Sequence, residues 1–204
     1  MPSEESSGVD QPAFWEYRYR GGQDRWDLGQ PAPTFVHLLS SSEAPPLGTV
    51  AVPGCGRGHD ALLFAARGYK VCGFDFAADA IADATRLALR AGAAATFLQQ
   101  DLFNLPRPFA GLFDLVVEHT CFCAIDPVRR EEYVEIVHWL LKPGGELVAI
   151  FFAHPRPGGP PYRTDAGEIE RLFSPRFKIT ALLPAPMSVP SRRGEELFGR
   201  FVRA

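Results

Sequence analysis

The 204 residues, 46% of them hydrophobic, are enough for one domain with a sizeable core. The 21 basic and 24 acidic side chains leave a formal charge of −3, which argues against a nucleic-acid partner. The acidic, polar residues 1–10 lack the basic-then-apolar order of a secretion signal, and no apolar run approaches membrane-spanning length. We therefore expect a cytoplasmic protein without a membrane partner, with a single domain over residues 1–204 and a disordered tail at residues 1–12.

Seven apolar or β-branched runs predict the strands of one sheet. They cover residues 47–53, 69–76, 95–100, 113–120, 146–152, 177–183 and 195–203. Helical patterns lie between them at residues 59–68, 80–91, 127–142 and 168–173. Pro127 suits the first position of the third helix, which the KPGG stretch breaks. The alternation predicts an α/β fold with a mostly parallel sheet and helices on both faces, and the hairpin-like end predicts an antiparallel last strand.

The cysteines lie in or beside apolar runs, and they lack the paired two-residue spacing of a zinc site. They are Cys55, Cys72, Cys121 and Cys123. We expect reduced thiols and no metal.

The stretch VPGCGRGHD follows the first predicted strand and opens the first predicted helix. Gly54, Gly56 and Gly58 stand at every second position, where they allow a tight turn and a close approach of the backbone to a ligand. A dinucleotide fingerprint spaces its glycines G-x-G-x-x-G to seat a pyrophosphate. Here the third glycine comes one residue early, and the helix opens with a histidine and an aspartate. The spacing favours S-adenosylmethionine, which has a nucleoside and an amino-acid moiety but no phosphate.

Acidic residues stand at the ends of the next predicted strands. Asp75 comes 21 residues after Gly54, where a carboxylate can accept both ribose hydroxyls. Asp101 is placed to reach the adenine edge, and Glu118 ends the fourth strand near the methionine end. An aspartate at a strand end is more often a helix cap or a turn residue. Together with the glycine turn, however, the acidic residues put such features at the ends of four successive strands, which predicts a cofactor site there.

Longer stretches resemble one methyltransferase family. VPGCGRGHD carries Pro53 where most methyltransferases have an acidic residue, and in this it is similar to the thiopurine methyltransferase family. The stretches CAIDPVRREEYVEIVHWLLKPGGEL, GGPPYRTD and VPSRRGEELFGRF look most like its halide, thiocyanate and thiol methyltransferase branch. The resemblance runs from Phe14 to Phe201 and departs from that branch at Glu118-His119, where Asp-Tyr is more usual. It implies a Rossmann-like class I methyltransferase fold and S-adenosylmethionine as the methyl donor.

The segment FWEYRYRGGQDRWDLGQPAP looks like the N-terminal cofactor lid of that family, which we expect at residues 13–40. The resemblance implies that Trp15, Tyr19 and Trp26 contact the cofactor. Beside the acidic residues, we also expect contacts from Gly54, Gly56 and Leu102. An aromatic face attracts a cation such as a sulfonium by about 0.5 to 2 kcal/mol. The alternative is that the tryptophans only anchor an N-terminal helix to the core.

The resemblance implies in-line displacement of the sulfonium methyl by a small nucleophile such as a halide, thiocyanate, hydrosulfide or thiol. A halide has no proton to remove, so the site needs an anion contact and an apolar wall more than a base. Tyr162 can donate a hydrogen bond to an anion, Arg192 can attract one, and the CFC triplet at residues 121–123 would line the wall. The alternatives are that Tyr162 caps a Pro-rich turn, that Arg192 or Arg193 is a solvated surface charge, and that the triplet is core.

His119 and His154 are the candidate bases for a neutral thiol, because histidine titrates near neutral pH. A histidine beside a strand end is more often only hydrogen-bonded structure, and of the two we keep His119 as a candidate catalytic residue. Three other functions stay open: a thiopurine or aromatic thiol S-methyltransferase, another small-molecule methyltransferase, and a non-catalytic cofactor-binding partner protein. The PPY at residues 160–162 is similar to a loop of DNA-base methyltransferases, but that loop should follow the fourth strand, so its position argues against this reading.

Overall fold

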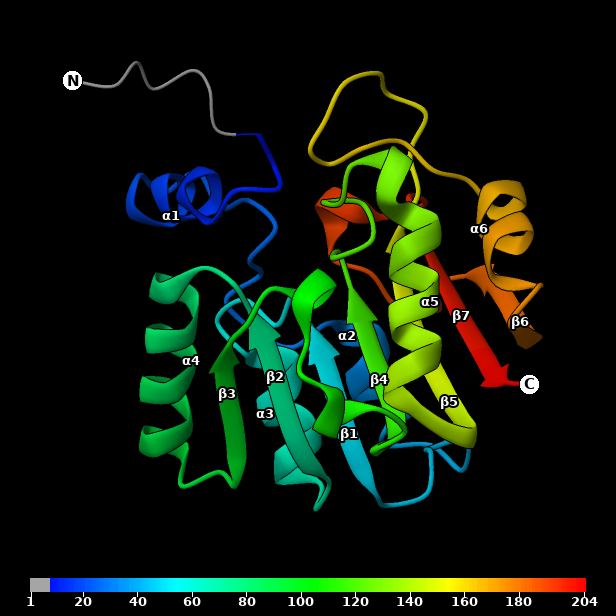
Figure 1. The fold of residues 1–204 in the computed structure, drawn as a ribbon, viewed down its shortest axis with the longest axis horizontal. Coiled ribbons are helices and arrows are strands. Elements are labelled where there is room, and N and C mark those ends of the chain that lie inside the picture. Colours follow the sequence, from blue (N-terminus) through cyan, green and yellow to red (C-terminus); the bar gives the residue numbers. More distant parts are fainter. Residues whose placement is uncertain (1–7) are drawn as a thin grey trace.

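A seven-stranded sheet forms the centre of the computed structural model, which describes residues 8–204 (Figure 1). Its strands are β1 (Thr49–Pro53), β2 (Lys70–Asp75), β3 (Ala95–Gln99), β4 (Phe113–His119), β5 (Leu141–Phe152), β6 (Phe177–Pro184) and β7 (Glu196–Arg203). They lie in the order β3-β2-β1-β4-β5-β7-β6, and β7 runs antiparallel to the other six strands. This confirms the predicted mostly parallel sheet. The order reverses between β1 and β4, which is the point where open α/β sheets bind ligands.

Helices cover both faces of the sheet, as the strand-helix alternation predicts. The α-helices are α1 (Pro12–Arg20), α2 (Pro33–Leu38), α3 (His59–Ala66), α4 (Ala78–Ala91), α5 (Arg130–Leu140) and α6 (Ala166–Phe173). Short 3-10 turns are η1 (Leu102–Asn104), η2 (Arg107–Phe109), η3 (Pro127–Arg129) and η4 (Pro190–Arg192). Helix α1 stands off the sheet and contacts α4 instead (Figure 1).

Two large apolar clusters form the core, one on each face of the sheet. Along β1, Val50 and Val52 join the cluster of α2 and α3, whereas Ala51 joins the cluster of α5 and α6. This alternation follows from the two-residue period of a strand. The neighbouring strand β4 is buried from Leu115 to Val117, as expected for a central strand covered on both faces.

The predicted C-terminal end of the helix at residues 127–142 was wrong. Helix α5 stops at Leu140, and Leu141 is already extended and paired with Phe113 in β4. Pairing with β4 resumes after a register shift, so residues 142–145 lie inside β5 rather than at a helix terminus. Tertiary pairing with β4 overrides the local helical pattern there.

Part of the predicted tail is attached to the fold. Val9 O accepts a hydrogen bond from Trp15 Nε1 at 2.8 Å, and Pro12 is the first residue of α1. Residues 1–7 of that tail lie outside the described residues. Between residues 8 and 204, no helix is long and apolar enough to cross a membrane.

Candidate active site

The glycine turn connects β1 to α3 at the carboxyl edge of the sheet. Gly54, Gly56 and Gly58 have φ angles of 58°, 52° and 79°, which residues with a side chain rarely adopt. A Cβ atom at Gly54 would lie 2.7 Å from Cys121 Sγ, and one at Gly56 would lie 3.1 Å from Tyr19 Oη. A Cβ atom at Gly58 would lie 2.8 Å from Phe97 Cζ. The turn therefore requires glycine for its conformation, and neighbouring segments approach closely at all three positions.

Asp75 lies at the end of β2 and is bonded to the glycine turn. Its Oδ2 accepts a hydrogen bond from Gly56 N at 3.0 Å, and its Oδ1 accepts one from Ala77 N at 2.9 Å. Burial raises the pKa of this carboxyl to about 6, although both backbone donors favour the ionised form. Each oxygen can accept a further hydrogen bond, so the carboxylate is able to bind the two hydroxyls of a ribose.

One aromatic cluster joins the lid segment to the start of α4. Its residues are Trp15, Tyr19 and Trp26 of the lid. The Trp26 ring meets the other two rings edge to face, at centroid distances of 5.3 Å from Trp15 and 5.4 Å from Tyr19. Trp26 Nε1 donates to Tyr19 Oη at 3.3 Å, and burial raises the pKa of Tyr19 well above its ordinary value. The cluster packs on Ala77 and Ala80, just beyond the end of β2. The structure thus brings all three residues to the predicted cofactor edge.

Arg57 fastens the lid segment to the glycine turn. Its guanidinium pairs with Asp24 and Asp27 of the lid and, through Nε at 2.8 Å, with Asp83 of α4. Burial acts to raise the pKa of Asp27, but hydrogen bonds from His59 and Arg57 outweigh it and hold that pKa well below its usual range. Arg57 was not among the residues predicted for the site, and in the sequence only its position between Gly56 and Gly58 signals this role.

Asp101 follows β3 at the same edge and caps η1. Its Oδ1 accepts from Phe103 N at 3.0 Å, and its Oδ2 accepts from Asn104 Nδ2 at 2.6 Å. Leu102 is buried in the cluster that contains α5. Asp101 therefore has the capping role that is common for aspartate at a strand end, and its contact with the adenine stays a prediction.

Glu118, at the end of β4, is fully buried behind residues 120–123. Its Oε1 accepts from Phe122 N at 3.0 Å, and its Oε2 accepts from Tyr133 Oη at 2.6 Å. Burial raises the pKa of Glu118, while these two donors favour its ionised form. The carboxylate thus ties the loop after β4 to α5, and its contact with the methionine end of the cofactor stays a prediction.

The loop after β4 buries the whole CFC triplet. Cys121 lies against Gly54 and belongs, with Phe122, to the core cluster, where the Phe122 ring packs against Phe151. Cys123 is also buried, so the triplet is core as the alternative proposed. Burial raises the pKa of Cys121 well above its ordinary value and that of Cys123 to about 12. Both thiols therefore stay protonated near neutral pH.

Arg192, in η4, is the buried member of the arginine pair. It is 6% exposed, whereas Arg193 is exposed, so the surface-charge alternative fails for Arg192. Its Nη2 donates to Trp26 O at 2.7 Å, and its Nη1 lies 3.0 Å from His119 Nε2. Glu196 Oε1 lies 3.5 Å from Nη1 and compensates part of the charge.

His119, at the end of β4, has a partner on each ring nitrogen. Its Nδ1 lies 2.7 Å from Asp60 Oδ2, and its Nε2 faces Arg192. Asp60 was not among the residues predicted for the site, because a contact between residues 59 positions apart leaves no local signal in the sequence. The other candidate base, His154, is 3% exposed, and burial lowers its pKa. His154 Nδ1 accepts a hydrogen bond from Arg156 N at 3.2 Å. A base role for His119 stays a prediction.

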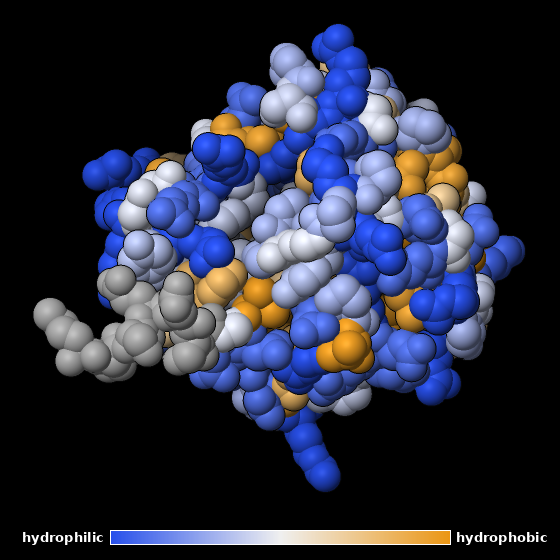
Figure 2. Space-filling model, turned by 90° about the horizontal axis from the view of Figure 1, so that it is seen from above, coloured by the Kyte–Doolittle hydropathy of each residue, from blue (hydrophilic) through white to orange (hydrophobic). Residues whose placement is uncertain are grey.

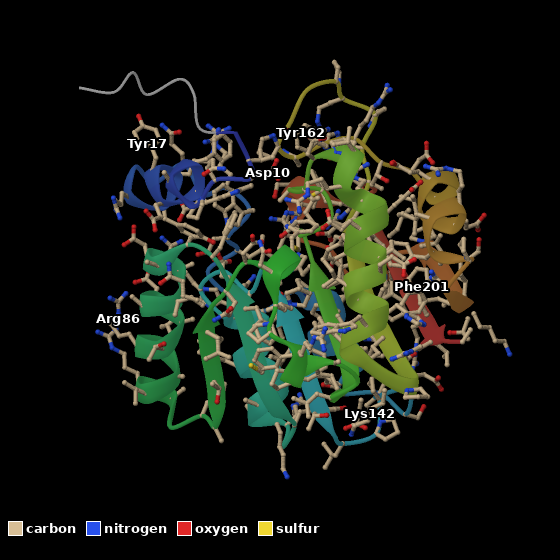
Figure 3. The ribbon with its side chains drawn as sticks, viewed as in Figure 1. Asp10, Tyr17, Arg86, Lys142, Tyr162 and Phe201 are labelled. Atoms are coloured by element: carbon tan, nitrogen blue, oxygen red, sulfur yellow. The ribbon has the colours of Figure 1, made fainter. Side chains whose placement is uncertain are left out.

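Tyr162 lies in the loop between β5 and α6, at the same end of the molecule as Asp10 and opposite Lys142 (Figure 3). Tyr162 N donates to Cys123 O at 2.7 Å, and Arg130 Nη2 donates to Tyr162 O at 3.4 Å. Burial raises the pKa of Tyr162, so its hydroxyl is a hydrogen-bond donor near neutral pH. Within residues 8–204, no hydrogen bond joins this side chain to Arg192.

The molecule has a cavity at the other end of the sheet. It measures about 740 Å³, and its walls include Asp114, Lys142 and Arg200. These side chains are already ion-paired, with Lys142 Nζ 2.7 Å from Asp114 Oδ1. The end that carries the glycine turn, seen from above, is mainly hydrophilic with small separate apolar areas (Figure 2). We assign the site to this end because the predicted residues converge there.

Comparisons with known proteins find one matching family and several similar proteins. The thiopurine S-methyltransferase family matches residues 10–198. Probable thiol methyltransferase 2 of Arabidopsis thaliana is 34% identical over 208 residues, which cover 100% of this chain and 88% of that protein. Thiocyanate methyltransferase 1 of the same plant is 36% identical over 191 residues, which cover 92% of this chain and 83% of that protein. In fold, the chain resembles Burkholderia thailandensis 1,6-didemethyltoxoflavin-N1-methyltransferase, solved with bound 1,6-didemethyltoxoflavin and S-adenosylhomocysteine, with a TM-score of 0.76, 21% identity and coverage of 96% and 88% of the two chains.

The raised pKa of Asp75 predicts how binding of the demethylated product, S-adenosylhomocysteine, depends on pH. Above the pKa of about 6 the carboxylate is ionised and can accept both ribose hydroxyls, and this affinity is lost as the pH falls through 6. Calorimetry should show affinity about tenfold weaker at pH 5 than at pH 7. Asp75→Ala should weaken binding about tenfold at pH 7 and flatten the profile. Asp114→Asn, at the opposite end of the sheet, should leave the affinity unchanged, and a wild-type profile in Asp75→Ala would rule out the ribose role.

The ion pairs of Arg57 predict that the lid loosens when this residue is lost. In the wild type, S-adenosylhomocysteine should protect residues 10–30 from proteases, because binding orders the segment that covers the ligand. Arg57→Ala removes the cation that joins Asp24 and Asp27 of the lid to the glycine turn, so much of this protection should disappear in limited proteolysis. Arg86→Ala is the matched control, because Arg86 pairs with Asp83 at 2.6 Å but contacts no lid residue. Equal cleavage of both variants would contradict the fastening role.

Proposed function

Because the chain belongs to the thiopurine S-methyltransferase family, it is an S-adenosylmethionine-dependent methyltransferase, and we propose that its acceptor is a small soft nucleophile: a thiol, hydrosulfide, thiocyanate or halide. The names of the plant relatives, a thiol and a thiocyanate methyltransferase, support this acceptor class. The observation that carries the proposal is the composition of the acceptor side. It has a buried arginine, protonated thiols and a histidine with both ring nitrogens engaged.

On the donor side, we assign the ribose to Asp75 and the sulfonium to the neighbourhood of the aromatic cluster. Asp75 already orients the glycine turn through Gly56 N, so a ribose bound there would meet a preformed acceptor pair. The edge-to-face packing of Trp26 supports a fixed ring position, and a fixed aromatic ring attracts a nearby cation without further ordering. The donor supplies the activated methyl group, and the chain supplies its position.

The transfer itself needs no proton donor or acceptor when the nucleophile is an anion. A lone pair of the acceptor forms a bond to the methyl carbon, the bond between that carbon and sulfur breaks, and its electron pair returns to sulfur. The anion and the sulfonium lose their charges together, so positioning and exclusion of water lower the barrier. Cys121 and Cys123, whose pKa values are raised by burial, stay thiols and do not compete as nucleophiles.

We assign the acceptor contacts to Arg192 and Tyr162. A guanidinium has five N–H donors, and the bonds to His119 and to Trp26 O leave others for an acceptor. Glu196 reduces the net charge at this point, so the site offers little compensation for stripping water from a hard anion, and a weakly hydrated nucleophile suits it better. A thiopurine or another aromatic thiol is the second candidate, favoured by the description of the family itself.

A product screen tests this proposal. The protein is incubated with the methyl donor and iodide, thiocyanate, hydrosulfide, a small alkyl thiol or a thiopurine, and methylated products are measured by gas or liquid chromatography. With the donor at saturation, we expect turnover on the small soft nucleophiles, with a flat profile for iodide from about pH 6 to 9 and a rise for the thiol toward a pKa of about 8.5. Tyr162→Phe should reduce turnover by up to about a hundredfold.

The control for Tyr162→Phe is Tyr17→Phe on the exposed face of α1, which should retain the wild-type rate. Turnover on the thiopurine alone would select the second candidate. Tight donor binding without turnover on any acceptor would support a non-catalytic partner protein.

A further inference from the structure

A chain of hydrogen bonds runs from one end of residues 26–32 to the other through the acceptor side. Ala32 N donates to Asp60 Oδ1 at 2.7 Å, and Asp60 Oδ2 lies 2.7 Å from His119 Nδ1. His119 Nε2 lies 3.0 Å from Arg192 Nη1, and Arg192 Nη2 donates to Trp26 O at 2.7 Å. The chain therefore begins and ends on the lid segment and crosses the end of β4 between these points.

The donor of each bond in this chain is fixed by chemistry. A guanidinium has only N–H donors, so His119 Nε2 must be the acceptor of the bond from Arg192. The ring proton then lies on Nδ1 and is donated to Asp60, whose other oxygen accepts from Ala32 N. A proton on Nε2 would face the guanidinium and break the bond to Arg192.

The imidazole of His119 is surrounded by side chains from four different elements. Asp60 approaches from α3, Arg192 from η4, and Glu196 from β7, with its Oε1 3.9 Å from Nε2. The Phe35 ring of α2 meets the imidazole edge to face at a centroid distance of 6.1 Å. Packing and two polar partners thus fix the orientation of the ring. Nε2 therefore has a defined position from which it can accept a hydrogen bond from the guanidinium.

We propose that Asp60 and His119 are positioning residues that couple the lid to the acceptor side by holding Arg192, and that His119 is not a general base. Arg192 takes one hydrogen-bond partner from the lid at Trp26 and the other from the end of β4 at His119. A donor bound under Trp26 therefore fixes the guanidinium before the acceptor enters. This inference rests on the proposed function, in which Arg192 contacts the acceptor.

Two variants of His119 separate positioning from base catalysis, with iodide and 2-mercaptoethanol as acceptors at saturating donor. His119→Gln keeps an acceptor oxygen but cannot act as a base, so kcat/KM should stay within about threefold of the wild type on both acceptors. His119→Phe keeps a ring for packing but offers no acceptor, so kcat/KM should fall by about tenfold or more on both, including iodide, which has no proton to remove. His37→Gln, on an exposed position of α2, is the control and should match the wild type.

Hydrogen exchange provides a readout that is independent of turnover. With S-adenosylhomocysteine bound, residues 26–32 should exchange faster in His119→Phe than in the wild type, and His119→Gln should restore protection. Asp60→Asn is a second variant for the case that His119→Phe does not fold. Its amide oxygen can still accept from Ala32 N, but its NH2 group faces Nδ1 and forces the proton to Nε2, so it should lose activity as His119→Phe does.

Loss of thiol turnover with normal iodide turnover in His119→Gln would overturn the proposal in favour of a base. Wild-type rates and exchange in both His119→Phe and Asp60→Asn would overturn the coupling. If the wild type methylates no soft nucleophile, the proposed function fails. Hydrogen exchange at residues 26–32 still decides whether the hydrogen bonds through Asp60, His119 and Arg192 hold the lid in place.

Discussion

The donor edge of this protein depends on one buried carboxylate. Asp75 binds the glycine turn through Gly56 N and the start of α4 through Ala77 N, so it joins the ends of two strands and one helix. The lid aromatics then pack on the same helix start, and Tyr19 Oη would lie 3.1 Å from a Cβ atom at Gly56. The cost of burying this charge appears in its raised pKa. A ribose would supply the hydrogen bonds that water otherwise gives such a group.

The lid is held by two arginines that reach it from opposite sides of the site. Arg57 extends from the glycine turn to the lid carboxylates, and Arg192 extends from η4 to the backbone carbonyl of Trp26. The Arg192 side chain is buried and the Arg57 side chain is partly buried. Salt therefore screens their interactions less than it screens those of exposed ion pairs. This arrangement links the sides that we assign to the donor and to the acceptor through the lid segment. The same segment carries the aromatic residues that we assign to the sulfonium.

Much of the fold could be read from the sequence, because hydrophobic periodicity marks the strands and the glycine turn marks the first crossover. The spacing of Asp75 from Gly54 also predicts that the two residues meet at the same edge of the sheet, because one strand-helix-strand unit separates them. The contacts of the acceptor side could not be read in this way. Arg192 and Trp26 are 166 positions apart, and the burial of Glu118 behind its loop depends on Tyr133 of a later helix. The early end of α5 has the same cause, since pairing with β4 decides it.

The central claim is that the donor lies at the carboxyl edge of β1, β2 and β4, with its ribose on Asp75 and its sulfur toward Cys121 and Arg192. A crystal structure of the protein with S-adenosylhomocysteine measures this directly. We predict both ribose hydroxyls within hydrogen-bonding distance of the Asp75 carboxylate and the Trp26 ring beside the sulfur. A ligand bound elsewhere, with Asp75 still bonded only to Gly56 and Ala77, would contradict it.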